Sequence, residues 1–367
     1  MRTVTRCWRI REPMVTRPWA RTFSGEQITV QQAHDAASQH CIELVRDRDR
    51  EHFLVGMLLP KQARSGYFAV RAMNVELSTI QEAVGGNAAT GQLRVGWWRE
   101  AIAQVYERGH VETFPQHPVV TALSSAISRH SLSRVLLDEY LDARERDLCH
   151  DSSLGFASLS QMELYAQHTA GSQMRLAVEC VLQGHNGGDG GGGGGGGEGG
   201  AGGMGTGAGA GAGTGAGAGA GAREAAAAAQ VAEHVGVASG LCTLLRGVPH
   251  HARVGECYLP RCAMERHGIN AKSIGIVAGD TENVNALHAV CLDVLEVVED
   301  RLRKAEELQD QVPRDARVPL LPATIAQHFA AQLRKSDGNV LHTAIMQPPS
   351  IGLMLKLWWR ATTGVYM

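Results

Sequence analysis

The stretch from residue 238 to residue 260 reads ASGLCTLLRGVPHHARVGECYLP and decides the class of fold. Apolar residues lead into it at every third or fourth position: Val231, Val235, Ala238, Cys242 and Leu245. This spacing places them on one face of a helix. The run GECYLP, residues 255–260, then has the composition of a loop that stops at a proline. The stretch therefore predicts the last turns of a buried helix followed by a loop.

The charged side chains of this stretch favour anions. Between Glu233 and Glu256 there is no Asp or Glu, and the stretch instead carries Arg246, His250, His251 and Arg253. Two carboxylates four residues apart would share one helix face. Such a pair could hold Mg²⁺, a hard cation that prefers oxygen ligands. Since neither carboxylate is present, we expect no Mg²⁺ site on this helix and no cofactor.

Composition excludes several classes of protein. The 367 residues contain 35 Lys and Arg against 37 Asp and Glu, so that nothing points to a nucleic-acid partner. Eight cysteines occur without a C-x-x-C pair, which favours reduced thiols within helices over a zinc or redox site. No apolar run approaches the roughly 20 residues that span a bilayer. The length allows one large domain.

Residues 1–25 differ in composition from the rest of the chain. They contain Glu12 as their single acid, and six arginines: Arg2, Arg6, Arg9, Arg11, Arg17 and Arg21. Arg-rich, acid-poor composition is typical of organellar transit peptides. The run Arg21-Thr22-Phe23-Ser24 resembles a mitochondrial processing site, which predicts a mature chain that starts near Ser24. The alternative is a disordered basic tail.

The rest of the chain reads as ten or more helices without strand alternation. Helical spacing of apolar residues predicts helices near 30–50, 64–82, 93–106, 118–148, 159–182, 225–254, 261–267, 282–309, 324–333 and 351–359. Residues 187–222 interrupt them with polyglycine and Gly-Ala alternation. Such a tract buries too little apolar surface to offset its ordering entropy, so we expect a disordered insertion within one domain.

Several ordered motifs resemble one family. They are Arg48-Asp49-Arg50-Glu51-His52-Phe53, the run YFAVRAMNVE at 67–76, Trp97-Trp98-Arg99, His117-Pro118-Val119, Tyr165 with Ala170-Gly171, and finally Leu244-Leu245-Arg246 with Tyr258-Leu259-Pro260. Their order is similar to that of the squalene/phytoene synthases. This resemblance implies a single isoprenoid-synthase-like helical domain over residues 30–366. Catalytic members of the family condense two prenyl diphosphates head to head.

The sequence departs from that family at both metal-binding runs. Where catalytic members carry aspartates, this chain has Asn74, Val75 and Ser78 in the first run and Gly247 and His251 in the second. Asn-x-Glu in the first run resembles a divergent, non-catalytic branch found in bacteria and mitochondria. That resemblance implies a pseudoenzyme that assists assembly of respiratory complex I on the matrix side of the inner membrane. Its expected partners are complex I subunits or other assembly factors, with a peripheral membrane contact.

The resemblance also defines a candidate site, a degenerate prenyl-diphosphate pocket. Its residues are Arg71, Asn74, Glu76, Arg246, His251 and Arg253. The arginines could hold a diphosphate directly, since guanidinium pairs well with phosphate oxygens; alternatively they pair with acids of the same fold, such as Glu76. Two other functions stay open: a prenyl transferase that uses carboxylates around Glu76, and an isoprenoid or lipid carrier. The segment LMLKLWWR, 353–360, either closes the helical bundle or lies on a membrane surface.

Overall fold

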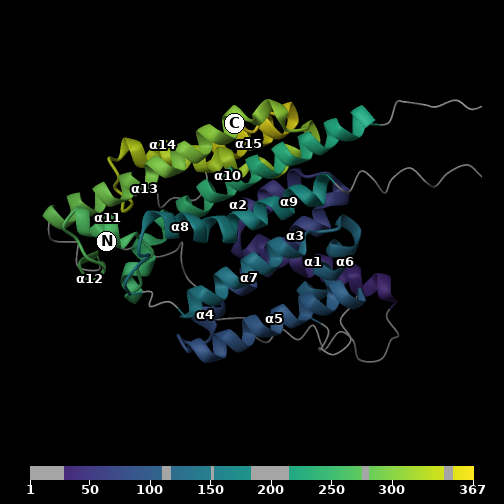
Figure 1. The fold of residues 1–367 in the computed structure, drawn as a ribbon, viewed down its shortest axis with the longest axis horizontal. Coiled ribbons are helices and arrows are strands. Elements are labelled where there is room, and N and C mark those ends of the chain that lie inside the picture. The colour runs from purple at the N-terminus through teal and green to yellow at the C-terminus, as the bar shows by residue number, and fades with distance from the viewer. Residues whose placement is uncertain (1–28, 110–116, 150–152, 183–214, 275–280, 343–349) are drawn as a thin grey trace, which may run out of the picture.

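A computed structural model describes residues 29–109, 117–149, 153–182, 215–274, 281–342 and 350–367. These ranges are helical, and their one β-type contact is an isolated bridge between Phe156 and Pro260. The all-α prediction is confirmed. Figure 1 shows helices packed lengthwise, with the C-terminal helices along one side and the N-terminal helices along the other. The expected transit peptide at 1–25 and residues 187–214 of the expected insertion lie outside the described residues.

The described residues of the N-terminal half form the helices α1 (Val30–Arg48), α2 (Arg50–Leu58), α3 (Lys61–Ser78), α4 (Ile80–Ala83), α5 (Ala88–Arg108), α6 (Pro118–His130) and α7 (Arg134–Cys149). Two breaks differ from the sequence prediction. Asp49 separates α1 from α2 and caps α2 by accepting a hydrogen bond from the backbone of His52 at 3.4 Å. Ser131 adopts a left-handed conformation (φ 46°) and ends α6, whereas apolar spacing predicts one continuous helix to residue 148.

The middle of the chain contains α8 (Leu159–Ala166), the π-helical segment η2 (Gln167–Gly171), α9 (Ser172–Leu182) and the 40-residue α10 (Gly215–Val254). The sequence predicts one regular helix over 159–182, and η2 interrupts it with one wide turn. Helix α10 begins at Gly215, so residues 215–222 of the expected insertion are helical. Pro249 lies inside α10, and the helix continues past this proline and past His251 to Val254.

The C-terminal part contains α11 (Arg261–Arg266), α12 (Ala271–Ile274), α13 (Thr281–Glu307), the 3₁₀ turns η5 (Gln309–Gln311), η6 (Arg314–Ala316) and η7 (Val318–Leu320), α14 (Pro322–Lys335) and α15 (Ile351–Thr363). Among the described helices, none is long and apolar enough to cross a membrane.

Two helices organise the packing. Helix α3 contacts α1, α6 and α9, while α10 contacts α9, α13, α14 and η2. Where α10 crosses η2 the backbones nearly touch, because a Cβ placed on Gly236 would lie 2.5 Å from the Cα of Gly171. Buried side chains from all these helices join one continuous apolar core. The interior faces of α3 and α10, which carry most of the candidate site, are thereby held in a fixed relation.

Candidate functional site

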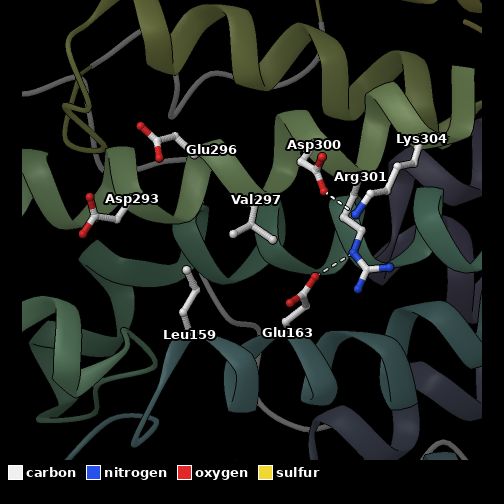
Figure 2. Close-up of a pocket in the computed structure, with 8 residues that line it drawn as sticks. All are labelled: Leu159, Glu163, Asp293, Glu296, Val297, Asp300, Arg301 and Lys304. Atoms are coloured by element: carbon white, nitrogen blue, oxygen red, sulfur yellow. Dashed lines mark hydrogen bonds and ion pairs between the residues drawn. The ribbon is translucent and has the colours of Figure 1, made fainter.

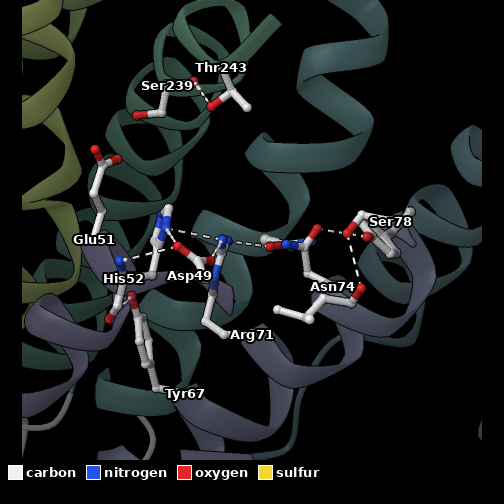
Figure 3. A network of polar contacts seen from close by, with 12 residues as sticks. Asp49, Glu51, His52, Tyr67, Arg71, Asn74, Ser78, Ser239 and Thr243 are labelled. Atoms are coloured by element: carbon white, nitrogen blue, oxygen red, sulfur yellow. Dashed lines mark hydrogen bonds and ion pairs between the residues drawn. The ribbon is translucent and has the colours of Figure 1, made fainter. Parts of the chain in front are cut away.

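Helix α3 presents Arg71 and Asn74 on one face, one turn apart. Arg71 is buried and makes an ion pair with Asp49 at the α1–α2 junction. Its guanidinium also donates to the side-chain oxygen of Gln173 on α9 and lies 3.1 Å from His52 Nδ1. Figure 3 shows Asp49, His52, Arg71 and Asn74 in one row of contacts. The first arginine of the candidate site is therefore bound on several sides by protein groups.

Asn74 is the centre of this polar network. Its Oδ1 accepts hydrogen bonds from Tyr140 Oη at 2.8 Å, from Gln173 Nε2 at 2.7 Å and from Arg144 Nη2 at 3.2 Å. An amide oxygen has two lone pairs, so three donors use its full accepting capacity. One of the three is a cation. The oxygen at the first position of the metal-binding run is thus already occupied by side chains of α7 and α9.

Arg144 extends the network toward the second half of the site. Its Nη1 donates to Tyr165 Oη at 2.9 Å, and Tyr165 Oη donates to Asp147 Oδ2 at 2.9 Å. Asp147 also hydrogen-bonds the side chain of Tyr258, in the loop after α10. The backbone of this loop is anchored by Phe156, whose amide donates to Leu259 O at 3.1 Å. A continuous chain of polar contacts therefore joins α3 to the Tyr-Leu-Pro motif.

The polar network keeps the side chains of Asp49 and Arg144 in their charged forms. Burial alone would raise the pKa of Asp49, but His52 and Arg71 outweigh burial and hold that pKa far below its usual range. Burial would likewise lower the pKa of Arg144, yet Tyr140, Tyr165 and Asp147 raise it. Both groups are thus ionised at neutral pH. Since their charges are balanced within the protein, neither is available to a ligand without leaving its partner uncompensated.

The second metal-binding run has been filled by an imidazole. A Cβ placed on Gly247 would lie 2.7 Å from Nε2 of His251, so the His251 ring covers the place of the missing side chain. The ring contacts the Tyr258 ring, with centroids 4.5 Å apart, and Nδ1 lies 3.3 Å from Glu256 Oε2. Burial, with a contribution from His250, lowers the pKa of His251 to about 4, so the ring is neutral at pH 7.

Arg246 and Arg253 are placed differently from each other. Arg246 forms a two-bond ion pair with Glu51 on α2, at 2.6 and 3.2 Å, and its guanidinium lies 5.9 Å from the Phe329 ring. Arg253 is exposed near the end of α10. The interpretation that the arginines pair with acids of the same fold holds for Arg71, which pairs with Asp49, and for Arg246, which pairs with Glu51. Glu76, the acid suggested as an example, contacts His117 instead.

Glu76 points away from the polar network. Two residues after Asn74, it lies about 200° around the helix. Its Oε2 is 3.4 Å from His117 Nε2, and His117 in turn packs its ring against Trp97 and Trp98. Burial raises the pKa of Glu76 to about 7 and lowers that of His117 to about 4. The structure therefore does not bring Glu76 together with Arg71 and Asn74, and the tryptophan pair packs on His117.

The residues present do not fit a Mg²⁺–diphosphate site. Mg²⁺ requires oxygen ligands that are free to coordinate it. At the first run the oxygen of Asn74 is saturated, and at the second run Gly247 and His251 supply no oxygen. In the part of the chain that the structure describes, no three His, Cys, Asp or Glu side chains are placed to hold a metal ion.

Sequence reasoning missed the groups that surround Asn74. Tyr140, Arg144 and Asp147 on α7 and Gln173 on α9 were assigned no role. Among them, the one sequence signal is Arg144, a charged residue in a helix that is rich in charged residues. That signal is weak, because a charged helix normally reads as solvent-exposed. The structure shows that the Arg144 side chain is largely buried.

A surface groove lies elsewhere, between α8 and α13, with a volume of about 460 Å³ (Figure 2). Four of its charged residues form two ion pairs: Arg301 with Glu163 at 2.6 Å across the groove, and Lys304 with Asp300 at 2.6 Å along α13. None of the six candidate residues lines it. The groove is therefore not an extension of the candidate site.

The chain is similar to curated proteins whose names describe an assembly factor of complex I. The chain is 25% identical over 326 residues to "NADH dehydrogenase (ubiquinone) complex I, assembly factor 6" of Homo sapiens, covering 88% of this chain and 82% of that protein. It is 26% identical over 329 residues to the Drosophila melanogaster homolog of that factor, covering 88% and 83%.

Solved structures share the fold. A dehydrosqualene synthase superposes with a TM-score of 0.67 at 16% identity, covering 91% of this chain and 98% of that one. A squalene synthase from Alicyclobacillus acidocaldarius superposes with a TM-score of 0.60 at 13% identity, covering 85% and 97%. The model of the squalene/phytoene synthase family matches residues 45–351, which include both altered metal-binding runs. The chain therefore belongs to the squalene/phytoene synthase family.

Proposed function

We propose that this protein is a non-enzymatic assembly factor for mitochondrial respiratory complex I. It uses a prenyl-synthase fold whose metal-binding positions serve as structural contacts. Its relatives in Homo sapiens and Drosophila melanogaster bear the name of complex I assembly factor 6. We extend that role to this chain because the match covers 88% of this chain and 82% of the human protein.

One observation carries the non-enzymatic part of this proposal. The oxygen of Asn74 accepts three donors, and one of them is the guanidinium of Arg144. Ionising a prenyl diphosphate requires cationic metal at the phosphate oxygens, held by protein carboxylates. A guanidinium at that position would repel the metal, and Glu76, the carboxylate nearest in sequence, lies on another face of α3 and contacts His117.

The proposal includes a location. We infer that residues 1–25 direct the chain to mitochondria and are removed there, since they hold six arginines and one acid. The mature protein then acts in the matrix, at the inner membrane, where its partners are complex I subunits or other assembly factors. Amino-terminal sequencing of the organellar protein is expected to find a start near Ser24, and an intact Met1 would contradict this.

Two assays on the same protein test the function. Purified chain incubated with labelled farnesyl diphosphate and Mg²⁺ or Mn²⁺ should form no condensed prenyl product. Expression in cells that lack their assembly factor 6 should restore complex I activity. The variant Glu76→Gln should restore it equally well, because Glu76 contacts His117 and no reacting group.

The enzyme alternative makes the opposite prediction in both assays. A metal-dependent condensed product that disappears in Glu76→Gln would establish a prenyl transferase with an unusual carboxylate. Loss of rescue in the same variant, with the variant still folded by circular dichroism, would support that conclusion. A known prenyl synthase of the family, assayed in parallel, confirms that the substrate and the metal are competent.

A further inference from the structure

Helix α15 is apolar on two opposite faces. Leu353 and Leu357 are buried against the core, four residues apart on the inner face. On the outside, Ile351, Leu355, Trp358 and Trp359 are 77%, 62%, 58% and 55% exposed, and we call these four residues the outer stripe. Residues at i, i+4 and i+7 share one helix face, so Ile351, Leu355 and Trp358 lie together, with Trp359 at their edge.

An outer face of this kind requires an explanation. The solvent side of an amphipathic helix normally carries charged and polar residues. Single exposed apolar residues are common on protein surfaces, but a contiguous group of large ones marks an interaction site. The outer stripe has two indole rings and two branched aliphatic side chains within nine residues. It therefore needs a partner that covers it.

The charges around the outer stripe specify an anionic partner. Residues 338–367 contain no Asp or Glu, and within α15 the charged residues are Lys356 and Arg360. Lys356 is exposed, and both it and Lys335 of α14 lie close enough to His328 to lower its pKa. Arg360, the other cation of α15, lies near one acid, Glu306 of α13. The exposed charge beside the outer stripe is thus positive.

The helix is held rigidly in place before any partner binds. Ser350 caps its first turn, accepting from Leu353 N at 3.2 Å, and Gly364 ends it in a left-handed conformation. Arg360 points back into the fold and donates to Thr324 Oγ1 at 2.8 Å and to Gln327 Oε1 at 3.1 Å. Because α15 is already folded, binding of a partner does not have to include the cost of folding this helix.

Among anionic partners, a bilayer surface fits the stripe best. Tryptophan is enriched at the headgroup level of membranes, where its ring is half in the apolar layer and its N–H can reach water. With 13 residues, α15 is too short to cross a bilayer, so it would lie in the interface plane. A lysine next to an inserted face is drawn to the negative surface potential of anionic lipid.

We propose that α15 docks this protein on an anionic membrane surface, with the outer stripe inserted among the lipid chains and Lys356 at the headgroups. This deepens the location proposed above, at an inner membrane. Vesicle binding is measured on purified protein and complex I rescue in cells, so that either proposal can fail alone.

Flotation of the full chain with lipid vesicles tests the docking. Vesicles of phosphatidylcholine mixed with phosphatidylglycerol should bind the protein, and vesicles of phosphatidylcholine alone should bind it more weakly. The variant Leu355→Glu/Trp358→Glu should bind the anionic vesicles about tenfold less tightly or worse, since two inserted apolar groups become charged. Lys356→Glu should reduce the preference for anionic vesicles and leave binding to neutral ones nearly unchanged.

The matched control is Leu93→Glu/Val135→Glu, which places the same charges at two exposed apolar residues on α5 and α7. It should bind as the wild type does, and since both double variants retain the arginines of residues 1–25, only α15 distinguishes them. Unchanged melting temperatures establish that all variants fold. The proposal is overturned if the wild type does not float with anionic vesicles, or if the α15 double variant binds them as tightly. A wild-type dimer that ignores vesicles and dissociates in the α15 variant would show that a second copy covers the stripe instead.

Discussion

At position 74 an amide oxygen accepts hydrogen bonds from Tyr140, Arg144 and Gln173. A carboxylate in the same place would pair with the Arg144 guanidinium at short range, and this ion pair would compete with any metal. At position 247 the absence of a side chain leaves room for the His251 ring. Restoring aspartate at either position alone would therefore not restore a metal site, because the space and the charge are already used.

The raised pKa of Glu76 predicts how the stability of the protein changes with pH. Burial raises its pKa from 4.5 to about 7 in the folded protein, so ionising Glu76 costs the folded state free energy. The wild type should accordingly lose stability as the pH rises from about 4.5 to about 7. Glu76→Gln removes this loss, and the variant should be more stable by about 1–2 kcal/mol at pH 8, with no gain below about pH 4.5.

Thermal melting of both proteins across this pH range measures the effect. If Glu76 paired with an arginine, the alternative raised in the sequence analysis, Glu76→Gln would weaken folding. The direction is reversed here because the partner is His117, whose pKa is lowered to about 4 and which is neutral at pH 7. A variant that is less stable than the wild type at pH 8 would show that Glu76 has a cationic partner in solution.

At the scale of elements, two interruptions orient the site. Asp49 ends α1 and caps α2, so that its carboxylate meets Arg71 at the junction of two helices. The π-helical turn η2 offsets α9 from α8, and Gln173 comes two residues after it. A π-helical turn inserts one residue and rotates the next turns of the helix around its axis. Both interruptions lie next to the polar network.

Close packing of α10 on η2 gives a prediction at this scale. A Cβ on Gly236 would lie 2.5 Å from the Cα of Gly171 and 2.7 Å from the carbonyl of Ala170, both backbone atoms. Gly236→Ala should therefore lower the free energy of unfolding by about 2 kcal/mol or more, because the helices must move apart. Denaturant unfolding measures the loss.

Gly96 provides the control for that experiment. It lies within α5, and a Cβ there would meet nothing within 4 Å. Gly96→Ala should stabilise the protein by about 0.5–1 kcal/mol, since alanine loses less backbone entropy in a helix than glycine does. Equal effects of the two substitutions would mean that the close crossing of α10 and η2 does not form in solution.

At the scale of the whole molecule, the polar network couples residues far apart in sequence. Gln173 bridges Arg71 and Asn74, 102 and 99 residues away. We expect Gln173→Leu and Asn74→Leu each to destabilise the protein by about 1–3 kcal/mol, because each leaves buried polar partners unsatisfied.

The double variant should cost less than the sum of the two single variants. Residues in one hydrogen-bond network show coupling energies of about 0.5–3 kcal/mol in a double-mutant cycle. Urea unfolding of the four proteins supplies that cycle. Strict additivity would indicate that the side chains of α3 and α9 act independently and that the network does not hold these helices together.

The helical class and the family could be predicted from the sequence. Apolar spacing shows which residues share one face of a helix, and the residues at 74, 75, 78, 247 and 251 can be read directly from the sequence. Helix ends were predicted less well: Asp49, Ser131 and η2 break helices that the spacing runs through. At these points a cap or a tertiary contact outweighs local propensity.

Only the tertiary structure decided which groups surround Asn74. Arg144 and Gln173 come from separate helices, and their meeting at Asn74 depends on how α7 and α9 pack on α3. Periodicity places a residue on a helix face, but it does not say which other helix that face meets. The pairing of Arg246 with Glu51, in place of Glu76, and the exposure of the outer stripe on α15 were decided in the same way. Both depend on the packing of helices that are distant in the chain.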